Sequence, residues 1–71
     1  MTYRRYRLIR DYSCEFGTLP AGSDIDVMGD RITFNGGMIE PQYYQVLSNL
    51  ISNETLHKTY LREVPIPYNK I

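Results

Sequence analysis

The strongest constraint in the sequence is an alternating segment, residues 24–34, that is interrupted by a glycine-first turn at Gly29-Asp30. Apolar and polar residues alternate on both sides of the turn, which is typical of strands with one buried face. Glycine at the first turn position adopts the positive φ that a two-residue hairpin needs. The segment therefore predicts an antiparallel β-hairpin. Its inward side chains are expected to be Ile25, Val27, Ile32 and Phe34, and its outward ones Asp24 and Asp26.

The segments around this hairpin also have strand and turn patterns. Residues 4–12 are rich in aromatic and aliphatic residues and alternate, so they predict a first strand with Tyr6 and Leu8 on one face. Residues 13–23 contain two glycines and a proline and predict a loop whose Phe16 and Leu19 fold back over the core. A second tight turn is expected at 35–37, followed by a short returning strand at 38–39.

A helix is predicted from Pro41 to Ser52. Proline is favoured at the first helical position, because the N–H that it lacks has no partner there. The helix carries an apolar stripe, and Asn53 is expected to end it in the left-handed conformation. Residues 55–63 fit helical spacing and strand composition equally, and we favour a last strand at 57–63. The residues of the stripe are Tyr43, Val46, Leu47, Leu50 and Ile51.

The C-terminal segment 64–71 is expected to be an extended tail that follows a single small domain at 1–63. Pro65 and Pro67 force an extended backbone path at alternate positions. An apolar extended segment needs a surface to lie against, either on its own domain or on a neighbour. We therefore predict partner contacts along this tail. Its apolar residues are Val64, Ile66, Tyr68 and Ile71.

The sequence indicates neither a disulfide nor a metal site that would stabilise its small core. At 71 residues it buries only about 60% of the surface that its unfolded form exposes. The single cysteine, Cys14, excludes an intramolecular disulfide, and no zinc-ligand spacing is present. A partner protein or further copies of the chain are the remaining common source of stability for a scaffold of this size.

Catalysis and metal binding find little support in the sequence. His57 is the only histidine, and it lies far along the chain from Cys14. Asp24, Asp26 and Asp30 copy part of a calcium-loop pattern, but the twelfth position holds Asn35 in place of the glutamate that the loop requires. We expect no enzyme activity, no metal, no cofactor and no small-molecule substrate.

Two sets of exposed side chains are candidates for partner contacts. Tyr44 is predicted to point away from the apolar stripe of the helix, which makes it a candidate interface anchor. Arginines interleave with tyrosines near the N-terminus, a combination used both by protein interfaces and by surfaces that bind single-stranded nucleic acid. The formal net charge of zero argues against nucleic acid. These candidates for nucleic acid or an acidic partner are Arg4, Arg5, Arg7 and Arg10.

The order of turns resembles the small SH3-like β-barrel modules of tailed-phage proteins. The resemblance is carried by the strand at 6–12, the Leu-Pro-Ala-Gly loop at 17–22, and the hairpin and second turn at 24–37. It implies an α+β, mainly β fold: a partly open barrel of four to five short antiparallel strands with one helix at about 41–52. It also implies a role in binding or assembly, without chemistry.

We therefore expect a structural protein that acts through protein–protein contacts, such as a minor capsid, head-decorating or connector protein of a phage virion. The alternative is a small regulatory protein that inhibits a host enzyme or a nucleic-acid complex, and a third option is a nucleic-acid-binding accessory protein. No apolar run approaches the ~18 residues of a membrane span, and no signal peptide is recognisable. The expected location is the cytoplasm where the chain is made, which for a phage protein precedes the virion.

Overall fold

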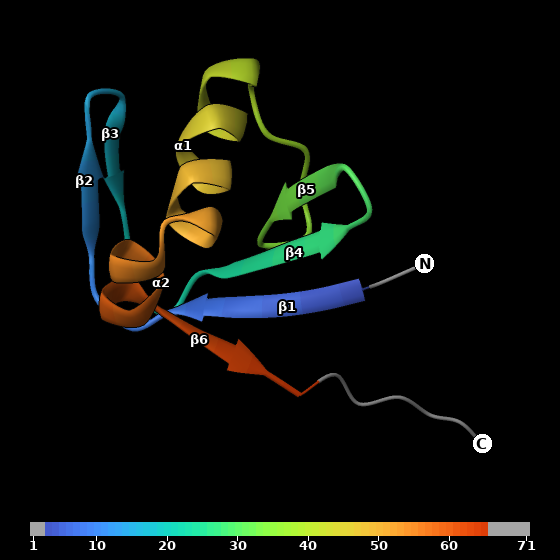
Figure 1. The fold of residues 1–71 in the computed structure, drawn as a ribbon. Coiled ribbons are helices and arrows are strands. Elements are labelled where there is room, and N and C mark those ends of the chain that lie inside the picture. Colours follow the sequence, from blue (N-terminus) through green and yellow to red (C-terminus); the bar gives the residue numbers. More distant parts are fainter. Residues whose placement is uncertain (1–2, 66–71) are drawn as a thin grey trace.

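The computed structural model describes residues 3–65 and places a four-stranded antiparallel sheet beside two helices (Figure 1). The strand order in this sheet is β5-β4-β1-β6. A separate two-stranded sheet, β2-β3, flanks the first helix on the side away from the large sheet (Figure 1). In chain order the elements are β1 (Tyr3–Leu8), β2 (Tyr12–Cys14), β3 (Gly17–Leu19), β4 (Asp24–Met28), β5 (Arg31–Phe34), α1 (Pro41–Ser52), α2 (Glu54–Tyr60) and β6 (Leu61–Val64).

The predicted β4–β5 hairpin is confirmed. Met28 pairs with Arg31 across the turn, and Gly29 has the positive φ of 64° that a glycine-first turn requires. Ile25 is fully buried, as predicted. Asp26 points outward as predicted, onto the face away from the helices, but it is only 7% exposed because its carboxylate lies against Arg5 and Tyr3.

Helix α1 is confirmed with the predicted bounds, and Pro41 lies in its first turn. Its apolar stripe packs on the sheet: Leu47 and Leu50 are buried, and the other stripe residues are half-buried against the same core. Leu19 also reaches this core from β3. The buried cluster is Tyr6, Leu8, Leu19, Ile25, Ile32, Leu47, Leu50 and Leu61.

The first predicted strand, 4–12, is wrong in its second half. β1 ends at Leu8, whose backbone pairs with Gly22 and Ser23, and the chain then bends. The Asp11 carboxylate accepts a hydrogen bond from the Ala21 N–H at 2.8 Å and so ties this bend to the opposite loop. The predicted loop 13–23 also contains strand residues, because β2 and β3 form a hairpin.

The region after α1 also differs from the prediction. Asn53 has an extended backbone, with φ −80°, rather than the left-handed conformation, and its side chain accepts a hydrogen bond from the Leu56 N–H. This cap starts a second helix, α2, over residues that we predicted as strand, so the last strand begins only at Leu61.

The sheets and helices give an α+β fold with antiparallel sheets. Residues 3–65 contain six strands and two helices, more than the four to five strands and one helix expected. Both sheets are open over these residues. No described helix has the length and apolarity needed to cross a membrane.

Candidate protein-docking site

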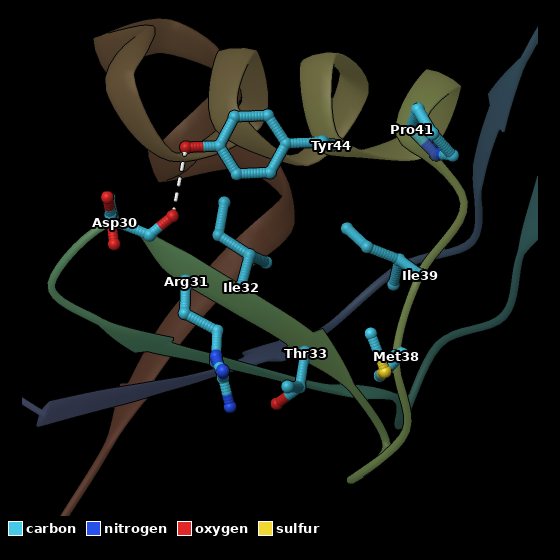
Figure 2. Close-up of a pocket in the computed structure, with 8 residues that line it drawn as sticks. All are labelled: Asp30, Arg31, Ile32, Thr33, Met38, Ile39, Pro41 and Tyr44. Carbon is cyan, nitrogen blue, oxygen red and sulfur yellow. Dashed lines mark hydrogen bonds between the residues drawn. The ribbon is translucent and has the colours of Figure 1, made fainter.

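Tyr44, predicted as an interface anchor, lies in α1 and is 41% exposed. Its hydroxyl donates a hydrogen bond to the backbone carbonyl of Asp30, in the β4–β5 turn, at 3.2 Å. This bond holds the ring across the gap between the helix and the start of β5 (Figure 2). Tyr44 therefore forms one side of a surface groove.

The groove lies between β5 and the first turn of α1 and has a volume of about 550 Å³. Figure 2 shows Ile32 pointing from β5 toward the helix, whereas Arg31 and Thr33 point to the opposite side of the strand. Most of the other residues that line the groove are apolar or aromatic. The lining residues are Asp30, Arg31, Ile32, Thr33, Met38, Ile39, Pro41 and Tyr44.

The groove exists because the chain that follows β5 pairs with it at one position only, Phe34 with Gly37, and then leaves the sheet. Asn35 (φ 51°) and Gly36 (φ 82°) form a tight turn, as predicted, and Phe34 bridges Gly37. The returning strand predicted at 38–39 does not form, since the chain departs from the sheet toward Pro41. The gap that this departure leaves is the groove.

Met38 is the most exposed large apolar side chain described, at 95%. It belongs to the segment 38–40, which also borders a second hollow of about 310 Å³ on its other side. Leu19, Phe34 and Tyr43 are among the residues that line this second hollow. The segment 38–40 thus has apolar depressions on both flanks and carries an exposed methionine between them.

Sequence reasoning found Tyr44 but missed Met38, Ile39 and Pro41 as parts of one site. The available signal was an apolar pair, Met38-Ile39, between a glycine turn and a helix start, and we interpreted it as a strand. The predicted tail contact Val64 lies in β6 opposite Arg5, away from the groove. The other predicted tail contacts, Ile66, Tyr68 and Ile71, fall outside the described residues.

Three of the four N-terminal arginines form ion pairs with carboxylates. Arg5 Nε is 2.8 Å from Asp26 Oδ1, and Tyr3 donates to the same carboxylate at 3.2 Å. Arg4 is 3.4 Å from Glu63 on the other face of the sheet. The hydrogen bond that Arg5 donates to Asp26, together with the charge of this carboxylate, raises the pKa of Arg5 above its ordinary value.

Arg7 and Asp24 form a second pair on the outer face, with Arg7 Nε 2.7 Å from Asp24 Oδ1. The hydrogen bond from Arg7 lowers the pKa of Asp24 and raises that of Arg7. Arg10 lies apart from these pairs, in the bend after β1. The arginines are therefore not gathered into one unpaired basic patch, and a phosphate would compete with carboxylates for three of them.

Cys14 and His57 lie in different elements and have separate structural contacts. Cys14 Sγ is 3.3 Å from the Gly17 carbonyl within the β2–β3 hairpin. His57 falls at the start of the strand predicted at 57–63, but it lies in α2: it is half-buried, its ring packs edge-on against Tyr6, and its Nδ1 lies 2.9 Å from the Ile51 carbonyl. Residues 3–65 contain no group of three metal-ligating side chains.

Comparisons with protein-family models, with curated proteins and with solved structures gave no match to this chain. The geometry of the site is therefore the basis for its function. What that geometry offers chemically is an apolar groove beside an exposed methionine, with hydrogen-bonding groups at its rim.

Proposed function

We propose that this protein is a non-enzymatic binding module that docks onto a partner protein through the groove between β5 and α1. The single observation that carries the proposal is the exposure of Met38, at 95%, beside a groove lined by Ile39, Pro41 and Tyr44. Clustered apolar surface of this kind marks interaction sites, whereas scattered apolar residues do not. Methionine and tyrosine are also enriched at protein interfaces.

The small size of the core supports the same proposal. Eight buried apolar residues hold the described part of the chain together, and its single cysteine cannot form a disulfide within the chain. A scaffold of this size gains stability when a partner covers further apolar surface. The residues around Met38 are the surface that such a partner would cover.

The setting that we propose is an assembly such as the virion of a tailed phage, where the module joins copies of itself or a larger structural protein. The SH3-like barrel and the virion role belong to this proposal, and the short antiparallel strands joined by glycine turns support the barrel. A regulatory protein that binds one foreign target would use the same groove. The two roles differ in oligomeric state.

Size-exclusion chromatography with light scattering, on the full chain and two variants, tests the proposal. Met38→Asp places a charge in the groove, and Ile9→Asp is the matched control, because Ile9 is an exposed apolar residue (46%) that does not line the groove. If the wild type forms a defined oligomer, we expect Met38→Asp to dissociate it and Ile9→Asp to retain it.

A monomeric wild type would direct the test to a foreign partner. Each of the three proteins would then be used as bait, with a lysate of the source organism. Proteins retained by the wild type and by Ile9→Asp but lost by Met38→Asp would support the proposal. It is wrong if neither self-association nor any retained protein is sensitive to Met38→Asp while circular dichroism shows that the variant is folded.

A further inference from the structure

β5 is an edge strand of the sheet, and the outward backbone groups of one of its residues have no hydrogen-bond partner within residues 3–65. In a two-residue hairpin the residues that flank the turn bond to each other, so Arg31 and Thr33 direct their N–H and C=O groups toward β4. Asn35, two residues after Thr33, follows the same pattern, because its N–H bonds to the Asp24 carbonyl of β4 at 2.8 Å. Ile32 and Phe34 therefore direct their backbone groups away from β4.

The outward backbone groups of Phe34 have partners, whereas those of Ile32 have none in the part of the chain that the structure describes. The Phe34 N–H and C=O both bond to Gly37, at 3.0 Å each. If this short ladder continued, Ile39 would pair with Ile32, but the chain has already departed toward α1. No residue in 3–65 forms a hydrogen bond with the outward N–H or C=O of Ile32. These two groups face the groove that Ile32 helps to line.

The opposite edge of the sheet is less suited to pairing. β6 carries the charged residues Arg62 and Glu63 and is followed directly by Pro65, which has no N–H to offer. Charges and prolines are the usual means by which an edge strand is protected from pairing. β5 has one charged residue, Arg31, and no proline, so it is less protected from pairing than β6.

We propose that the groove receives an extended segment of a partner protein, which adds to β5 as an antiparallel strand and presents an apolar residue followed directly by an acidic one. This inference rests on the proposed function and names the chemistry of its partner. Strand addition at an open edge uses backbone hydrogen bonds for affinity and alternate side chains for specificity.

The strand register determines which residue of the partner bonds to Ile32 and which of its side chains enters the groove. A residue opposite Ile32 exchanges two hydrogen bonds with it, and in an antiparallel pair its side chain lies on the same face as that of Ile32. That face holds the apolar wall formed by Ile39, Pro41 and Tyr44. An aliphatic or aromatic side chain is the one that this wall accommodates.

The next residue of the added strand lies opposite Arg31, on the outer face of the sheet. Arg31 is exposed, and no carboxylate within the described part of the chain forms an ion pair with it. Opposite charges across a strand pair stabilise the pairing and like charges destabilise it. An acidic residue therefore complements this position.

The test uses the full chain and a displayed library of random octapeptides as the probe. Enriched peptides are synthesised, and their affinities are measured by calorimetry. We expect a shared apolar–acidic pair, and we expect Arg31→Glu to lower the affinity at least tenfold while Arg62→Glu, on the opposite edge strand, leaves it within about threefold.

N-methylation of the peptide provides a measurement that leaves the protein unchanged. Methylating the amide of the apolar residue should lower the affinity at least tenfold, because that N–H bonds to the Ile32 carbonyl, whereas methylating the following amide, which points away, should have little effect.

Three other outcomes overturn the inference, and they separate it from the proposed function. Peptides that require Met38 but tolerate both methylations would show groove binding without strand addition, so the proposed function would stand and the inference would fall. A wild-type dimer that Met38→Asp dissociates, with no peptide enriched, would make a second copy the occupant. An absence of any peptide or protein whose binding depends on Met38 would remove both.

Discussion

Asp26 is the one charged residue classed as buried within residues 3–65, and its surroundings explain how the sheet tolerates it. Its carboxylate accepts hydrogen bonds from Arg5 at 2.8 and 3.2 Å and from the Tyr3 hydroxyl at 3.2 Å. We expect Asp26→Ala to lower the free energy of unfolding by about 1–3 kcal/mol, because it leaves these donors without their acceptor. Asp24→Ala, whose carboxylate is more exposed, should cost less. Urea denaturation of both variants measures the difference, and equal losses would contradict this account.

Asp24 gives the molecule a predictable response to acid. The hydrogen bond from Arg7 lowers the pKa of Asp24 from its ordinary value of 3.8. The folded state therefore binds fewer protons than the unfolded state between the two pKa values. Stability from this pair is present above the unfolded pKa of 3.8 and is lost as the pH falls through the lowered pKa of the folded state. Thermal unfolding of the wild type and of Asp24→Asn between pH 2 and 6 tests this prediction: the variant should lose less stability than the wild type on acidification.

At the scale of elements, the turn at Asn35-Gly36 controls where the chain leaves β5. Gly36 has φ 82°, and a Cβ there would meet no atom within 4 Å, so Gly36→Ala carries only the conformational penalty of about 1–2 kcal/mol. Gly37 is the matched control, because its φ is not positive and a Cβ would be in ordinary contact with the Phe34 carbonyl at 3.7 Å. We expect Gly36→Ala to destabilise the protein clearly more than Gly37→Ala in urea denaturation. Similar effects would show that the turn tolerates a side chain at Gly36.

The elements that the sequence predicted well are those specified by neighbouring residues. The β4–β5 hairpin follows from alternation around Gly29, and α1 follows from Pro41 and the apolar stripe. The prediction for the region after α1 failed because one residue belongs to the ends of two helices. Asn53 ends α1 and also caps α2 through its side chain, and our prediction used only the first role. β2 and β3 were missed because their pairing depends on a hairpin of only three residues on each side.

At the scale of the whole molecule, the docking groove could not be predicted because it is made by segments that the fold brings together. Tyr44 was identifiable by its position on a helix. Its contact with Asp30, and the gap between Ile32 and Ile39, depend on how α1 lies over the sheet. The composition includes tyrosine and methionine, which are common at protein interfaces, but it does not show where these residues lie in the fold. Patterns along the chain predict faces of elements, whereas a groove between elements requires their packing.

The whole fold depends on a core small enough for one side chain to decide its stability. Ile25 is fully buried at the centre of the large sheet, between β1 and β5. Ile25→Ala removes buried apolar volume and should lower the free energy of unfolding by about 2–5 kcal/mol. Domains have only about 5–15 kcal/mol in total, so a chain of this length should lose a large part of its stability. Ile9→Ala, at a 46% exposed isoleucine, should cost within about 0.5 kcal/mol. Both are measured by urea denaturation monitored by circular dichroism, and a loss at Ile25 no larger than at Ile9 would mean that this core does not hold the fold together.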